Sequence, residues 1–259
     1  RQKLEFIMGN KPSKWGSDDI PVSEITKNQI VAVPFFSASS QTFVDSHTIE
    51  LGTVDGSDIF YSLNNSDYRR YYEPIIINKQ SIIYSYAKKN NVKSKTVSSE
   101  YFPRDDSKKI KILSKYANQY AAAGDKTLID QLRGGNNYRT GNWQGYREDL
   151  NVIVDISKVK KINSISLGCH QDVRSWIFYP KQVNYWSSID GKNYTYQGKV
   201  LANFTDNIEG SMQKDFELNV TNLNARYIKI KAENYGVCPD WHLGAGGKTW
   251  IFVDEITIK

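Results

Sequence analysis

The chain has 259 residues, of which 39% are hydrophobic and 13% aromatic, enough for one large or two ordinary folded domains. This aromatic content excludes a disordered chain, and no stretch approaches the ~20 apolar residues of a membrane-spanning helix, so we expect no membrane insertion. The formal charge of +6 comes from 34 basic and 28 acidic residues spread along the chain. Proteins that bind nucleic acid usually concentrate their basic residues in one stripe, so no nucleic-acid partner is expected.

The first 20 residues show no sustained apolar period, and we interpret residues 1–20 as the tail of a preceding domain or as a linker. From residue 21 onward, short apolar segments of period two alternate with turn signals such as Asp55-Gly56 and Asn64-Asn65. We therefore predict a small immunoglobulin- or fibronectin-III-like antiparallel sandwich over residues 21–103. Its expected strands are 30–36, 47–51, 58–63, 74–77, 81–87 and 96–102.

A run of charged residues at 104–109 separates this region from a second periodic region and marks the predicted domain boundary. No segment beyond it shows a helical period, and Asp190-Gly191 supplies a tight hairpin turn. Eight or so strands in about 150 residues predict a jelly-roll sandwich over residues 107–259, which makes the whole chain all-β. The expected strands are 152–156, 162–167, 183–187, 194–200, 215–220, 227–232 and 250–258.

The chain begins with Arg rather than Met, so we expect it to be a piece of a longer or processed protein. Its two cysteines, Cys169 and Cys238, can form one disulfide or none. Each lies just after a predicted strand, in a loop that also holds aromatic and polar residues. We hypothesise that a bridge between them braces these loops.

Catalysis is not expected within this chain. It has only three histidines and shows no nucleophile elbow, phosphate loop or metalloprotease signature. Glu148-Asp149 and Asp254-Glu255 are adjacent carboxylates, but neighbours in a strand point to opposite faces. Neither pair is therefore a natural acid–base dyad.

Three loops of the second region, at 136–143, 168–176 and 234–242, combine a tryptophan with hydrogen-bonding side chains. A sugar presents C–H faces that stack on aromatic rings and hydroxyls that bond to Arg, His or Asn. Tryptophans also seal the ends of sandwiches, and we favour that role for Trp143 and Trp250. For Trp176 and Trp241, sugar binding and packing stay equally open.

A possible cation site involves residues at the ends of the second region. Asp130 lies in a polar loop, Thr140 follows it, and Glu255 lies in the last expected strand. Oxygen ligands of this kind suit calcium, a hard cation that takes six to eight of them in general. A single Asp in a loop is more often a turn residue, so the spacing alone leaves both interpretations open.

At these residues the second region resembles a coagulation factor 5/8 type C (discoidin) domain, and it is similar to the discoidin-like tails of secreted bacterial β-N-acetylhexosaminidases. The motifs are LID (128–130), RGG (133–135), TGNWQG (140–145), VIVD (152–155), WIFYP (176–180), SIDGK (188–192), GVCPDWHLGAGG (236–247) and FVDEI (252–256). The first region resembles the chitobiase C-terminal, fibronectin-III-associated module. Its motifs are VPFF (33–36), QTF (41–43), IFYSL (59–63), YEPI (72–75) and SIIYSYA (81–87).

The resemblance implies ligands for this sequence. It implies a structural calcium, held by the side chains of Asp130 and Glu255, by a hydroxyl or carbonyl of Thr140, and by carbonyls of Thr127 and Asp254. Related family 32 carbohydrate-binding modules hold galactose-type or N-acetylhexosamine sugars in loops at one end of the sandwich. The residues in comparable loops here are His170, Arg174, Trp176, Asn234, Trp241 and His242.

The resulting hypothesis is a non-catalytic, carbohydrate-binding accessory region of a glycoside hydrolase that is secreted, periplasmic or on the bacterial cell surface. Its expected partners are a glycan and the catalytic domain of the same longer chain, a hydrolase of the β-N-acetylhexosaminidase type. Two alternatives remain: a structural module that packs against that catalytic domain, and a surface adhesion domain. Aromatic and Arg-rich loops are favoured at protein interfaces as well.

Overall fold

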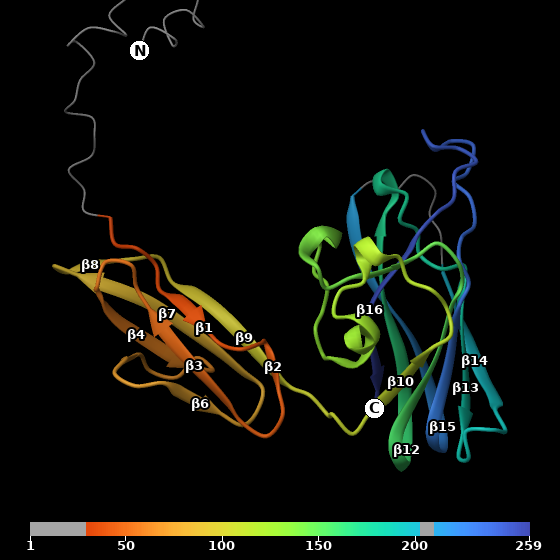
Figure 1. Ribbon diagram of the computed structural model, residues 1–259, viewed down its shortest axis with the longest axis horizontal. Coiled ribbons are helices and arrows are strands. Elements are labelled where there is room, and N and C mark those ends of the chain that lie inside the picture. Colours follow the sequence, from red (N-terminus) through yellow and green to blue (C-terminus); the bar gives the residue numbers. More distant parts are fainter. Residues whose placement is uncertain (1–29, 203–209) are drawn as a thin grey trace, which may run out of the picture. The chain divides into compact units, whose positions relative to one another are not determined.

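The computed structural model describes residues 30–202 and 210–259, and strands dominate these residues (Figure 1). The predicted tail over residues 1–20 lies outside the described residues. The chain divides into two compact units, and the all-β prediction is confirmed. None of the described helices is long and apolar enough to cross a membrane. The helices beyond residue 110 are short 3₁₀ segments: η3 (Asn118–Tyr120), η4 (Gly124–Ile129), η5 (Tyr138–Thr140) and η6 (Val173–Ser175).

The strands between residues 35 and 103 form two sheets. One sheet has the order β1-β3-β6, and the other has the order β2-β9-β7-β4-β5 with β8 paired to β7. The strands are β1 (Phe35–Ser37), β2 (Thr42–Phe43), β3 (His47–Gly52), β4 (Asp58–Leu63), β5 (Arg69–Arg70), β6 (Ile75–Ile77), β7 (Ser81–Lys89), β8 (Val92–Lys93) and β9 (Val97–Pro103).

Alternation and turn chemistry explain this region. In β7 every second residue from Ser81 to Ala87 is buried, and Ile83 and Ala87 are fully so, as expected for a strand with one face on a core. The pairs Asn64-Asn65 and Asn90-Asn91 both adopt positive φ values at hairpin turns. Asn tolerates this left-handed conformation better than other residues with side chains. The turn predicted at Asn64-Asn65 is therefore confirmed.

The strands between residues 109 and 258 form one seven-stranded sheet, in the order β11-β16-β12-β15-β13-β14, with β10 paired to β12. Figure 1 shows the long strands β12 and β15 running through the middle of this unit. The strands are β10 (Lys109–Ile112), β11 (Gln144–Tyr146), β12 (Leu150–Asp172), β13 (Gln182–Ser188), β14 (Thr195–Leu201), β15 (Ser211–Ala232) and β16 (Ile251–Ile258).

The two longest strands correct the sequence interpretation, which expected two separate strands in place of each. The pairing between β12 and β15 shifts register between residues 155 and 160, and Ser157 takes a φ of 70° there. A bulge of this kind bends a strand without ending it. The segments 152–156 and 162–167 are therefore the two halves of one bent strand.

The core of this unit lies between inward-facing residues of β12, β13, β15 and β16, and its members include Val152, Leu167, Tyr185 and Ile230. Cys169 belongs to this core, whereas Cys238 is buried in the loop between β15 and β16. Both cysteines are free thiols, so the hypothesised disulfide is wrong. The alternation of β12 explains why, because it turns Cys169 into the sandwich and away from the loops.

Candidate functional site

The loop after β12 is closed tightly at its base. Asp172 and Ile177 exchange backbone hydrogen bonds of 3.0 and 3.1 Å across it, and η6 lies between them. Trp176 ends that turn in the left-handed conformation, with a φ of 64°, which is rare for a bulky side chain and indicates that its surroundings fix it. Its side chain is 37% exposed, so the loop presents an indole to solvent.

The loop between β15 and β16 packs against one face of this indole. It folds back on itself through backbone hydrogen bonds between Cys238 and Gly247 and between Gly246 and Cys238. The Trp176 ring lies directly on Gly244 and Gly247, and a Cβ atom added to Gly247 would come within 2.5 Å of it. Only glycine leaves room for the ring at these two positions.

His242 locks the two loops together. Its Nε2 donates a hydrogen bond of 2.7 Å to the Val173 carbonyl, and its Nδ1 accepts one of 2.9 Å from the Gly244 N–H. The residue is only 8% exposed. Both ring nitrogens are therefore engaged, and His242 positions the loops instead of offering a free nitrogen to a sugar, which corrects the expectation for this residue.

Two exposed indoles flank this imidazole. The ring of Trp241 lies 5.9 Å from that of His242, and the ring of Trp176 lies 6.2 Å from it, as centroid distances. Trp241 is 43% exposed, and Arg174 is also exposed in η6. We call the surface of Trp176, Trp241 and Arg174 the indole ledge.

His170 is not part of this surface, which is a second correction. It lies inside β12, not in a loop, and its side chain is completely buried, 4.9 Å from the Trp143 ring. Its two ring nitrogens are the only buried side-chain polar atoms without a hydrogen-bond partner among the described residues. Burial lowers the pKa of His170, so the folded chain favours its neutral form.

The packing role expected for Trp143 and Trp250 is confirmed. Both side chains are buried, and together with Ile177 and Phe252 they form a small apolar cluster of their own. The Trp143 indole donates a hydrogen bond of 3.1 Å to the Gly135 carbonyl. Aromatic residues of similar sequence context thus divide into a buried pair and an exposed pair.

Asn234 shapes a neighbouring hollow. Its Oδ1 accepts hydrogen bonds from the Gly236 N–H and the Thr249 hydroxyl, at 2.7 and 2.6 Å. Its own N–H donates to the Asp149 carboxylate at 2.9 Å. These bonds engage its carbonyl oxygen in fixing the turn that follows β15.

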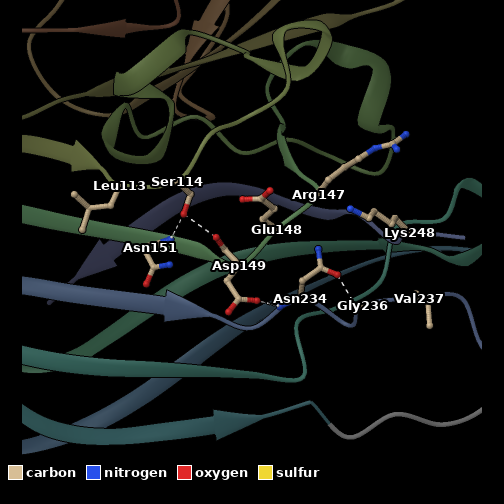
Figure 2. Close-up of a pocket in the computed structure, with 10 residues that line it drawn as sticks. All are labelled: Leu113, Ser114, Arg147, Glu148, Asp149, Asn151, Asn234, Gly236, Val237 and Lys248. Atoms are coloured by element: carbon tan, nitrogen blue, oxygen red, sulfur yellow. Dashed lines mark hydrogen bonds between the residues drawn. The ribbon is translucent and has the colours of Figure 1, made fainter.

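The hollow beside Asn234 has a volume of about 580 Å³ (Figure 2). Sequence reasoning did not identify Arg147 and Lys248 as site residues, because they stand far apart in the chain and belong to no motif of sugar-binding loops. The hollow is lined by Leu113, Ser114, Arg147, Glu148, Asp149, Asn151, Asn234, Gly236, Val237 and Lys248.

Two of the expected calcium ligands, Asp130 and Glu255, are carboxylates close enough for their charges to repel each other. Burial, with a smaller contribution from the neighbouring charge of Asp130, raises the pKa of Glu255 to about 8. Burial likewise raises the pKa of Asp130 to about 6. The Gln131 N–H donates a hydrogen bond of 2.9 Å to Glu255, which stabilises the charged form only in part.

The other three expected ligands use their side chains elsewhere. Asp254 accepts hydrogen bonds from the Arg133 side chain and the Gly134 N–H. The hydroxyl of Thr127 donates to Ala121, and that of Thr140 donates to Gly134. No group of three or more His, Cys, Asp or Glu residues in the described part of the chain is arranged to hold a metal. The side chains thus offer a cation two carboxylates, not a complete set.

A comparison with models of known families identifies the family of the chain. A family model described as "F5/8 type C domain" matches residues 109–250, which is more than half of the chain. The chain therefore belongs to the F5/8 type C family. No curated protein matches it.

Solved structures are similar to it at low identity. A GH29 fucosidase from Ruminococcus gnavus, in complex with fucose, is 12% identical, with a TM-score of 0.38 over 59% of this chain and 25% of that one. The chain therefore corresponds to about a quarter of the fucosidase's length. The C-terminal domain of a Bacteroides fragilis chitobiase is 21% identical (TM-score 0.33; 58% and 92% covered). The Clostridium perfringens module CpGH89CBM32-5, in complex with GalNAc-β-1,3-galactose, is 15% identical (TM-score 0.37; 59% and 94% covered).

Proposed function

We propose that residues 107–259 form a non-catalytic domain that binds a glycan on the indole ledge. One observation carries the proposal: two indoles remain exposed on loops that His242 locks in place. Exposing a large aromatic side chain forgoes the stabilisation that its burial would give, so a locked and exposed pair points to a ligand.

The chemistry of the ledge suits a sugar. The faces of Trp176 and Trp241 can stack on the C–H face of a pyranose, and the Arg174 guanidinium can donate hydrogen bonds to its hydroxyls. The loops are held by backbone hydrogen bonds, so little conformational freedom is lost on binding. A shallow ledge of this kind is expected to bind with a Kd of roughly millimolar to micromolar.

The wider proposal concerns the longer protein. We propose that this chain is the accessory region of a secreted glycoside hydrolase, of the β-N-acetylhexosaminidase type, and that residues 21–103 act as a spacer. The ledge would then hold N-acetylhexosamine or galactose units and raise the concentration of substrate around the catalytic domain. A structural calcium at Asp130 and Glu255 belongs to the same proposal.

No catalytic role is proposed for this chain. Of the adjacent carboxylate pairs, Asp149 is paired with Lys231 at 3.0 Å, and Asp254 is paired with Arg133 at 2.9 Å. Each pair thus has only one carboxylate left without an ion pair among the described residues. Acid–base hydrolysis of a glycoside needs two carboxyl groups on opposite sides of the scissile bond.

Isothermal titration of the whole chain with galactose, N-acetylgalactosamine and N-acetylglucosamine oligosaccharides tests this function. We expect measurable binding, and a loss of about tenfold or more for Trp241→Ala. Ile189→Ala, which removes an exposed apolar side chain on the turn after β13, is the matched control and should bind normally. If none of these oligosaccharides, and none of the acidic probes described below, binds to the chain, the proposal is overturned.

One observation favours a second candidate, the packing module. Leu243, two residues after Trp241, is fully exposed, and Val237 is 52% exposed in the same loop. Such residues also anchor protein interfaces. A chain that binds no saccharide, but forms a complex with the separately expressed catalytic domain that Leu243→Asp abolishes, would favour this function.

A further inference from the structure

Hydrogen bonds between its lining residues hold the hollow of Figure 2 in shape. Leu113, Ser114 and Asn151 line one part of it. The Ser114 hydroxyl joins the segment after β10 to the start of β12, because it donates to the Asp149 carbonyl at 2.7 Å and accepts from the Asn151 N–H at 2.7 Å. Asp149 also ties this part to Asn234. The opening therefore exists before any ligand arrives.

Some of the charged side chains that line the hollow have an ion-pair partner, and others do not. Asp149 is neutralised, because Lys231 lies 3.0 Å from its carboxylate. Arg147 and Lys248 are both exposed, and neither forms an ion pair within the described residues. In Figure 2, Arg147 and Lys248 lie to the right of the other two charged lining residues, Glu148 and Asp149. Two unpaired cations against the one unpaired carboxylate of Glu148 leave an excess of positive charge.

Arg147 is also held in position. Its guanidinium lies 4.4 Å above the ring of Trp250, which is itself buried. A cation–π contact of this kind restricts the side chain without using its hydrogen-bond donors. A planar guanidinium with free donors matches a planar carboxylate, to which it can donate two parallel hydrogen bonds.

The remaining lining residues suit the rest of a sugar ring. Glu148 can accept hydrogen bonds from hydroxyls, and Leu113 and Val237 are about half exposed and can contact C–H groups. The loop that carries Val237 and Lys248 also carries Trp241, so the hollow and the indole ledge share one structural support. A glycan bound on the ledge could therefore extend toward the hollow.

We propose that the hollow is a subsite for a carboxylated sugar unit, whose carboxylate binds Arg147 and Lys248. This inference rests on the proposed glycan binding and adds to it the class of sugar that the domain prefers. It makes no use of calcium, and it assigns Glu148 the binding of hydroxyls.

The test compares acidic oligosaccharides with their carboxyl-reduced forms. The probes end in galacturonate, glucuronate or N-acetylneuraminate, and each is titrated into the whole chain beside its neutral, reduced partner. We expect at least one acidic probe to bind about tenfold or more tightly than its partner. This preference should shrink when the salt concentration rises from about 50 mM to about 500 mM, since exposed charges are screened.

Variants assign the preference to the hollow. Arg147→Gln combined with Lys248→Gln should remove the tenfold preference and leave binding of the neutral partner within about twofold. The control, Lys192→Gln combined with Lys199→Gln, removes the same charge from exposed residues that do not line the hollow, and it should keep the preference. Trp241→Ala should weaken both probes of a pair.

The outcomes separate this inference from the proposed function. Equal binding of acidic and reduced probes, with Trp241→Ala still weakening both, overturns the subsite and keeps the glycan-binding ledge. A preference that the control variant also loses overturns the subsite too, because it shows attraction to net charge alone. Sulfated probes that bind as tightly as carboxylated ones overturn the assignment to a carboxylate. A chain that binds none of these probes overturns both proposals.

Discussion

Two regions of the C-terminal unit bring tryptophan next to histidine, with opposite results. Under the loop at 134–143, Trp143 covers His170, and neither side chain reaches solvent. In the loops at 172–177 and 234–249, His242 is buried but Trp176 and Trp241 are exposed. The same residue types thus form a core in one place and a surface in the other.

Hydrogen bonding separates the two cases. His242 satisfies both ring nitrogens and joins two loops, whereas His170 satisfies neither. A buried polar group without a partner carries the full penalty of desolvation, and one with partners contributes to stability. An imidazole near an indole therefore says little about function until its partners are known.

The largest expected effect comes from truncating the buried indole. Trp143→Ala should lower the free energy of unfolding by about 3–5 kcal/mol, because it leaves a cavity over His170. Trp241→Ala should lower it by less than about 1 kcal/mol, because its ring is exposed and packs only in part. Urea denaturation of both variants measures the difference, and equal losses would contradict the division into core and surface.

Glu255 is a further buried polar group. Its carboxylate accepts hydrogen bonds from Gln131 but has no ion pair within the described residues. Because burial raises its pKa from 4.5 to about 8, the folded chain keeps a proton that the unfolded chain releases between these values. The free energy of unfolding should therefore fall as pH rises from about 5 to about 8, by about 1.4 kcal/mol for each unit of pKa difference. Glu255→Gln should flatten this fall, as measured by denaturation across pH.

Adding calcium to the same pair of proteins tests the proposed cation site. If the ion binds Asp130 and Glu255 in the folded chain, millimolar calcium at pH 8 should raise the Tm of the unmodified chain. It should have no effect on the Tm of Glu255→Gln. An equal shift in both, or a shift in neither, would contradict the predicted site.

The two histidines form a matched pair for a smaller effect. His242→Leu should lower the free energy of unfolding by about 1–3 kcal/mol, since it leaves the Val173 carbonyl and the Gly244 N–H without their partner. His170→Leu should leave the free energy of unfolding unchanged or raise it, since the two ring nitrogens of His170 have no hydrogen-bond partner. A larger loss for His170→Leu than for His242→Leu would reverse the roles assigned to them.

The smallest effect is the acid dependence of stability. Because burial lowers the pKa of His170, the unfolded chain takes up a proton below about pH 6.5 that the folded chain does not. The free energy of unfolding should therefore decrease as pH falls through this range, opposite in sign to the contribution of Glu255. The slope should disappear in His170→Leu, and its persistence there would assign it to another group.

Sequence reasoning succeeded where local chemistry decides the structure. The strand at 58–63, the Asn64-Asn65 turn and the buried roles of Trp143 and Trp250 all follow from alternation, turn preferences and aromatic packing. The two indoles of the ledge were also named, although the sequence left sugar binding and packing equally open for them.

Sequence reasoning failed where contacts between segments far apart in the chain determine the structure. The segment around His170 was expected to be part of a loop at 168–176, but pairing with β15 and β16 extends the strand through it. Arg147 and Lys248 are about a hundred residues apart, and only the closure of the sheet brings them to one hollow. No spacing rule within the chain predicts that meeting.

The glycines that pack against Trp176 restrict how the indole ledge can evolve. Any side chain at Gly244 or Gly247 would occupy the volume of the indole, so related sequences that keep this tryptophan must keep both glycines. Leu243 precedes Gly244 in the chain, is fully exposed and has no such restraint. If the ledge binds a glycan as proposed, variation that changes its ligand preference should concentrate at Leu243 and Trp241, while the two glycines underneath stay unchanged.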